Sequence, residues 1–113
     1  MIRLGVITGL AREAECLQGL DNTQSRCAGA DTERARCRAQ DLVEAGAQAL
    51  LSFGICGGLD PALAPGSVIV ASSVIAPDGT GFDVDTGWRN TITDAVASTV
   101  EVVSAPLVGS DQP

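Results

Sequence analysis

Three glycines follow the most apolar stretch of the chain, in the sequence SFGICGGL at residues 52–59. Glycines at positions 54, 57 and 58 let a backbone turn sharply and expose N–H groups that no side chain shields. Such groups can approach an anion or a sugar closely. The spacing is not that of a dinucleotide-binding GxGxxG motif, and no GK[ST] follows, as it would in a P-loop. The pattern is equally typical of a binding loop and of a structural strand exit.

Carboxylates and thiols are the other groups that could do chemistry. Glu13 follows the first predicted strand in TGLAREAE, where a buried carboxylate could orient or deprotonate a water. An exposed acid in the first turn of a helix is the ordinary alternative, for Glu13 as for Glu15. Asp111 follows another predicted strand, where a turn residue is equally ordinary. Cys56 lies among the glycines, and without a histidine to activate it we expect a small core residue rather than a nucleophile.

The composition excludes several classes of function. The 113 residues contain no histidine, lysine or tyrosine, which excludes histidine triads, histidine metal sites, Schiff-base lysines and P-loop lysines. A net charge of −7 disfavours nucleic acid as a partner. Arg34, Arg36 and Arg38 are spaced to spread around a helix as a solvated surface.

The cysteines and the hydropathy pattern indicate the compartment. The four cysteines are too far apart for a CxxC metal site, and the opening MIRLGVITGL does not have the layout of a secretory signal. No apolar stretch approaches the roughly 20 residues of a membrane span. We therefore expect reduced thiols in a cytoplasmic protein that binds no metal or other cofactor and does not span a membrane.

The spacing of apolar residues predicts an α/β protein. We expect strands over 2–8, 47–55, 67–76 and 100–108, a brief strand near 25–28, helices over 11–17, 32–45 and 88–97, and a polar loop over 77–87. Residues 47–55 are apolar almost throughout, which is typical of a central strand covered on both faces. A bulge is expected at Ser72-Ser73. Together these elements predict a mixed, largely parallel central sheet with flanking helices.

Residues 1–113 are expected to form a single α/β domain. The last residues, GSDQP, come directly after a predicted strand, and three helices would cover a sheet of four or five strands thinly. We therefore expect the N-terminal portion of a longer domain.

The segment LSFGICGGLDPALAPGSVIVAS resembles the glycine-rich segment of the superfamily of purine nucleoside phosphorylases and methylthioadenosine/adenosylhomocysteine nucleosidases. The opening LGVITGLAREAE is similar to the first strand and turn of that superfamily. TGLAREA together with SFGICGGLDPALAPG is most similar to its hopanoid-associated phosphorylase-like branch, which is credited with removing adenine from adenosylhopane. The resemblance implies a nucleoside phosphorylase-like fold, a homo-oligomer, and an enzyme that cleaves the N-glycosidic bond of an adenine nucleoside with water or phosphate.

The resemblance also implies roles for particular residues. An ungapped alignment from Gly5 places Glu13 on the glutamate that positions the hydrolytic water in the nucleosidases. Backbone groups would form a floor beneath the ribose and the nucleophile. The substrate-binding positions implied in this way are Gly9, Gly54, Ile55, Cys56, Gly57, Gly58 and Asp111.

Phosphate binding is where the sequence departs from the phosphorylases. Those enzymes hold phosphate with an arginine and a serine or threonine at the positions of Ser52 and Ile55. An aliphatic side chain cannot bond to phosphate, which leaves only backbone N–H groups of residues 55–58 for that anion and favours water as the nucleophile. In the superfamily the ribose-binding Met-Glu pair and the aspartate that protonates the purine lie beyond the segment corresponding to GSDQP.

Two other classes of function stay open. One is a catalytically inactive nucleoside-binding module, which would bind ligand without releasing adenine. The other is an oligomerising α/β subdomain that pairs through an incomplete sheet, with concentration-dependent stability.

Overall fold

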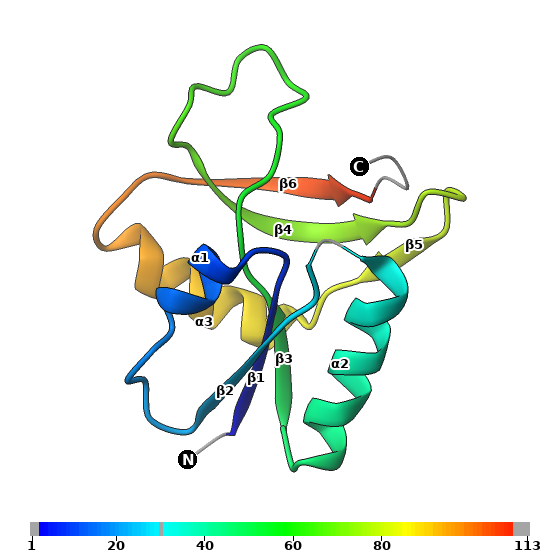
Figure 1. The fold of residues 1–113 in the computed structure, drawn as a ribbon. Coiled ribbons are helices and arrows are strands. Elements are labelled where there is room, and N and C mark those ends of the chain that lie inside the picture. Colours follow the sequence, from blue (N-terminus) through cyan, green and yellow to red (C-terminus); the bar gives the residue numbers. More distant parts are fainter. Residues whose placement is uncertain (1–2, 30, 110–113) are drawn as a thin grey trace. The chain divides into compact units, whose positions relative to one another are not determined.

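The structure is a computed structural model that describes residues 3–29 and 31–109. The chain divides into two compact units, Met1–Gly57 and Gly58–Pro113, and each is described by itself (Figure 1).

The first unit is built on a parallel sheet of three strands, β1 (Leu4–Thr8), β2 (Thr23–Cys27) and β3 (Ala49–Ser52). Their order is β2-β1-β3, so β1 lies in the middle (Figure 1). The helices α1 (Ala11–Glu15) and α2 (Thr32–Glu44) connect the strands. Because all three strands are parallel, their carboxyl ends meet at one edge of the sheet, where α/β proteins commonly build a site.

Leu42 of α2 packs against the face of β1 on which Gly5 lies, and the next residue, Val6, faces the other side of the sheet. Val6 and Leu42 are fully buried, and a Cβ at Gly5 would approach Leu42 Cβ to 3.2 Å and Leu50 Cδ2 to 3.0 Å. A larger residue at position 5 would push α2 and its neighbours away from the sheet, since contacts this short are rare for real Cβ atoms.

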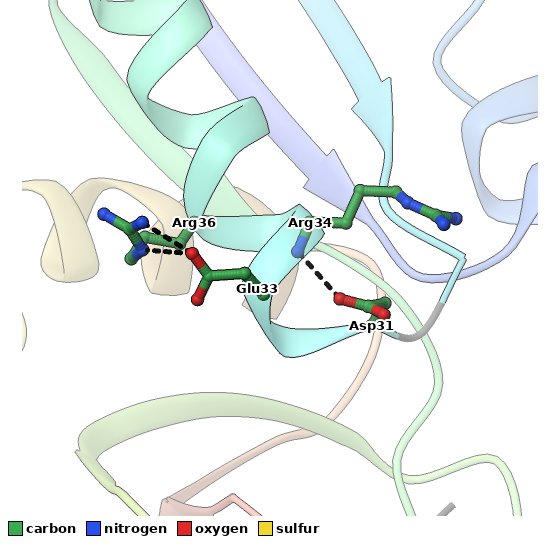
Figure 2. A network of polar contacts seen from close by, with 4 residues as sticks. All are labelled: Asp31, Glu33, Arg34 and Arg36. Carbon is green, nitrogen blue, oxygen red and sulfur yellow. Dashed lines mark hydrogen bonds and ion pairs between the residues drawn. The ribbon is translucent and has the colours of Figure 1, made fainter.

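α2 covers nearly the predicted range 32–45, and residues typical of helix ends lie at both of its termini. The Asp31 side chain accepts a hydrogen bond from the Arg34 backbone N–H at 2.8 Å and caps the helix (Figure 2). Arg36 pairs with Glu33 at 2.5 Å on the exposed surface (Figure 2). At the other end, Gly46 has φ 103°. The Gly46 N–H donates to Val43 O and the Ala47 N–H to Leu42 O, the two bonds of a Schellman motif.

The prediction that residues 47–55 form a central strand is wrong for the described sheet. β3 covers only Ala49–Ser52 and lies at the edge, while β1 is central. Leu50 and Phe53 are 41% and 39% exposed. The long apolar run therefore reflects a short edge strand followed by exposed apolar residues, rather than a strand buried on both faces.

The described residues of the second unit form a mixed sheet of order β5-β4-β6 and the helix α3. β4 (Val68–Ile75) pairs in parallel with β6 (Val102–Val108) and antiparallel with β5 (Gly81–Asp83), and α3 spans Thr86–Ala97. The register of β4 against β6 shifts between Ala71 and Ser73, which confirms the bulge predicted there.

Arg89 of α3 satisfies polar groups at this bulge. Its Nε donates to the carbonyl of Ala71 at 3.1 Å, and a guanidinium nitrogen bonds to the Ser104 hydroxyl on β6. One side chain thereby joins the helix to both parallel strands of the second unit.

The fold class is confirmed as mixed α/β with largely parallel strands and flanking helices, although the described strands form two three-stranded sheets. The predicted loop over 77–87 is partly wrong, because β5 pairs with β4 there and α3 begins at Thr86. Asp85 starts the helix early by accepting the Trp88 N–H at 2.7 Å. Across residues 3–29 and 31–109, none of the helices is both long enough and apolar enough to cross a membrane.

Candidate functional site

The candidate site lies at the carboxyl edge of the parallel sheet in the first unit, where β1 turns into α1. The backbone N–H groups of Gly9 and Leu10 both donate to Oε1 of Glu13, at 3.0 and 2.9 Å. Glu13 occupies the third position of α1 and accepts from the backbone of Leu10, the residue before the helix, as in half of a capping box. The turn after β1 thus fixes one carboxylate oxygen.

The second oxygen of Glu13 is fixed by the neighbouring strand. The backbone N–H of Ile55, just beyond β3, donates to Oε2 at 2.7 Å. The β3 exit is also joined to β1 by a bond from Phe53 N–H to Ile7 O at 3.0 Å. Glu13 therefore ties the turn after β1 to the exit of β3 through a bond to Ile55, 42 residues further along the chain.

The environment of Glu13 stabilises its ionised form. The side chain is buried, with 8% of the residue exposed. The Ile55 N–H lowers the pKa of Glu13 most; burial acts in the opposite direction, and the Leu10 and Gly9 N–H groups lower the pKa further. The net result is a pKa below the ordinary glutamate value, so Glu13 is a carboxylate at neutral pH.

The hydrogen bonds leave Glu13 a limited capacity for chemistry. A carboxylate has about four acceptor positions; two bonds go to Oε1 and one to Oε2. The remaining position is on Oε2, the oxygen that faces the β3 exit. It can accept a proton-bearing group such as a water or a sugar hydroxyl, and the charge can stabilise a nearby cation.

Gly54 lies directly against this carboxylate. A Cβ at position 54 would lie 2.6 Å from Cδ and 2.7 Å from Oε1 of Glu13, and closer still to Oε2. The structure thus brings together four of the predicted site residues: Gly9, Glu13, Gly54 and Ile55.

The other predicted site residues are not part of this cluster. Cys56 is exposed, so the prediction of a core residue is wrong; it lies beyond the end of β3, among exposed residues. A Cβ added at Gly57 would meet no heavy atom within 4 Å, Glu13 included, and Gly58 belongs to the second unit. Asp111 lies outside the described residues.

The expectation that the backbone N–H of Ile55 is available to bind phosphate is wrong. Its N–H group was one of those available to an anion, but it is bonded to Glu13 instead. The Ile55 side chain is 83% exposed and carries no polar atom. Neither group of this residue can therefore hold a phosphate.

Sequence reasoning missed Leu10, which contributes its N–H to Glu13. The available signal was the glutamate three positions after it, the second half of a capping-box pattern. The first half was absent, because leucine has no side-chain oxygen.

The described residues contain no cluster of three or more His, Cys, Asp or Glu that could hold a metal ion. A hollow of about 300 Å³ in the first unit lies at the opposite edge of the sheet, lined in part by Arg3, Asn22 and Gly46. None of the described residues that line it is a carboxylate.

Comparison with known proteins gives one match. A family model described as the phosphorylase superfamily matches residues 27–112, more than half of the chain. The matched range includes the glycine-rich stretch and begins after Glu13. No curated protein and no solved structure matches the chain significantly.

Proposed function

The chain belongs to the phosphorylase superfamily, and from this premise we propose that it cleaves the N-glycosidic bond of an adenine nucleoside with water as the attacking group. The superfamily supports nucleoside phosphorylase or nucleosidase activity in general. The choice of water rests on one observation, the buried carboxylate of Glu13 bonded to the Ile55 N–H.

The proposed reaction breaks the bond between C1′ of the ribose and N9 of adenine and forms a bond from C1′ to the water oxygen. Positive charge develops on the sugar in the transition state, and a carboxylate beside it stabilises that charge. Oε2 of Glu13 accepts a hydrogen bond from the water and orients it. The bonding pair leaves with adenine, which takes up a proton, and the water loses one.

The lowered pKa of Glu13 suits this role. A carboxylate with a low pKa is a weak base and would deprotonate a free water poorly. A water attacking a positively charged sugar becomes acidic as its bond to C1′ forms, so a weak base is sufficient late in the step. Glu13 therefore acts first by orientation and charge, and then as the proton acceptor.

The side chain and backbone N–H of Ile55 both disfavour phosphate as the nucleophile. Its exposed side chain is apolar and its N–H is bonded to Glu13. An anionic phosphate placed at Oε2 would also be repelled by the ionised carboxylate, whereas a neutral water would not.

The substrate proposed in finer detail is adenosylhopane, with adenine as the released base. This rests on the resemblance of TGLAREA and SFGICGGLDPALAPG to the hopanoid-associated branch. A cytoplasmic homo-oligomer remains part of the same proposal.

Release of adenine by the purified protein tests the proposed function. Adenosine and adenosines with a thioether or a long alkyl group at C5′ are incubated with and without phosphate, and adenine is separated and measured. We expect adenine and the free sugar in phosphate-free buffer. Strict dependence on phosphate, with a sugar 1-phosphate as product, would contradict the choice of water.

A nucleoside-binding module is the second candidate. The observation in its favour is that three backbone N–H groups already occupy Glu13, as they would in a purely structural tie. Equilibrium binding of the same nucleosides without adenine release, at any phosphate concentration, identifies this alternative.

A further inference from the structure

We propose that Gly54 is a positioning residue for Glu13: its lack of a side chain leaves the space in which the Glu13 carboxylate lies between the exits of β1 and β3. The expected effect of Gly54 on turnover rests on the proposed function. Its expected effect on the position of the Glu13 carboxylate is independent of that function.

The first step of the argument is steric. Real Cβ atoms essentially never approach another heavy atom within 3.0 Å. A Cβ at position 54 would come within that limit of Cδ, Oε1 and Oε2 of Glu13. The three heavy atoms nearest to this Cβ all belong to the Glu13 carboxylate, so the closest conflict is with that group.

The second step concerns which group would move. The end of a glutamate side chain is flexible, so alanine at position 54 displaces the carboxylate more easily than it displaces a strand. The displaced carboxylate cannot keep the bond from Ile55 at 2.7 Å together with those from Gly9 and Leu10. We therefore expect Gly54→Ala to fold, with Oε2 of Glu13 displaced from its position.

The third step shows that position 54 is special among the glycines of the stretch. A Cβ at Gly57 would have no heavy atom within 4 Å, and one at Gly58 would meet only Leu63 at 3.7 Å or more. Neither of these two glycines, nor Gly54, has a φ in the positive range that disfavours a side chain. The requirement at position 54 is thus space for Glu13 rather than backbone freedom.

Charged side chains do not hold the Glu13 carboxylate in place. Arg12 and Glu15 flank Glu13 on α1 and are exposed, and the bonds that hold the carboxylate come from backbone N–H groups. Those bonds depend on where the carboxylate lies, which makes the titration of Glu13 a direct report of its position.

The test compares Gly54→Ala with Gly57→Ala by following the ¹³C-labelled carboxyl group of Glu13 by NMR as the pH is lowered. We expect the pKa of Glu13 to rise toward the ordinary glutamate value in Gly54→Ala and to stay unchanged in Gly57→Ala. An equal pKa in the wild type and in Gly54→Ala would overturn the proposal.

Turnover gives a second readout. Displacing the carboxylate by about 1 Å should lower adenine release about 100-fold and move the acid limb of its pH profile upward. Gly81→Ala is the control for turnover, because a Cβ at Gly81 in β5 also meets nothing within 4 Å. If the wild type releases no adenine, the proposed function fails, and the titration still decides the role of Gly54.

A double variant covers the case in which Gly54→Ala does not fold. Combining it with Glu13→Ala removes the carboxylate that a Cβ would meet. Recovery of folding in the double variant supports the proposal, since the penalty then acts through Glu13. Failure of the double variant, with Glu13→Ala alone folded, overturns it.

Discussion

At the scale of single residues, one carboxylate, that of Glu13, has an observed structural task and a proposed chemical one. Three backbone N–H groups hold it between the turn after β1 and the exit of β3, and one acceptor position on Oε2 remains. Its structural bonds and its proposed chemistry therefore cannot be separated by a deletion alone. Stability and turnover must be measured together.

Glu13→Gln should lower the stability of the fold at neutral pH. The amide offers one oxygen, so at least one of the N–H groups of Gly9, Leu10 and Ile55 faces an NH₂ group, and a lost buried bond costs about 1–3 kcal/mol. Glu15→Gln is the matched control, because Glu15 is exposed on the same helix. Urea denaturation at pH 7 measures the difference, and equal stabilities would contradict the described bonding.

The stability difference should depend on pH in a defined direction. The pKa of Glu13 is lowered in the folded protein, so the stabilisation by its carboxylate is complete above the ordinary glutamate pKa. It is lost as the pH falls through the lower folded-state pKa. The unfolding free energies of the wild type and Glu13→Gln should therefore converge in acid. A gap that stays constant from neutral to acidic pH would argue against this linkage.

Much of the site could be predicted at this scale, and its detailed bonding could not. The order strand, turn, helix placed Glu13 at the sheet edge that Gly54 also reaches, because parallel strands end at the same edge. Only half of the capping-box pattern marks the Leu10 N–H, and the Ile55 N–H carries no sequence signal of its own. The alignment of Ile55 with Glu13 follows from strand register, which only the folded chain reveals.

At the scale of the elements, the N-terminal cap of α2 is a separable contribution to the first unit. Asp31→Ala removes the bond from Arg34 N–H at 2.8 Å and should lower stability by about 1 kcal/mol. Gln40→Ala, an exposed change within the same helix, should be close to neutral. Denaturation midpoints of the two variants check this, and a larger loss for Gln40→Ala would refute the role of the cap.

In the second unit, loss of the Arg89 side chain should lower stability. Arg89→Ala leaves the Ala71 carbonyl at the bulge and the Ser104 hydroxyl without this donor. An unpaired polar group costs about 1–3 kcal/mol where water cannot replace the bond. Asn90→Ala, exposed and next to it on α3, is the control. Thermal unfolding should separate the two variants clearly; coincident transitions would count against the contact.

The elements that sequence predicted well have signals that act locally. Asp31 and Gly46 mark the two ends of α2, and the β-branched residues of β4 mark a strand. β5 was missed because three exposed residues are too few to show alternation, and its pairing depends on β4. The position of β3 at the edge was missed because an apolar run reports composition and not the order of strands.

At the scale of the whole molecule, the proposal fixes the source of the new oxygen on the sugar. When adenine is released in the presence of phosphate, the sugar should be recovered as the free sugar and not as its 1-phosphate, as mass spectrometry would show. The reason is the bonded N–H and apolar side chain of Ile55, which offer phosphate no donor. A sugar 1-phosphate as the main product would show phosphorolysis instead.

The central claim is that Glu13 orients the water that cleaves an adenine nucleoside, and the most direct test is kcat for adenine release by the wild type, Glu13→Gln and Glu15→Gln. Loss of an orienting carboxylate should lower kcat about 10²- to 10⁴-fold in Glu13→Gln, with nucleoside binding largely kept and Glu15→Gln unaffected. Each variant is assayed only where denaturation shows it to be folded. Equal kcat for folded Glu13→Gln and the wild type would contradict the account.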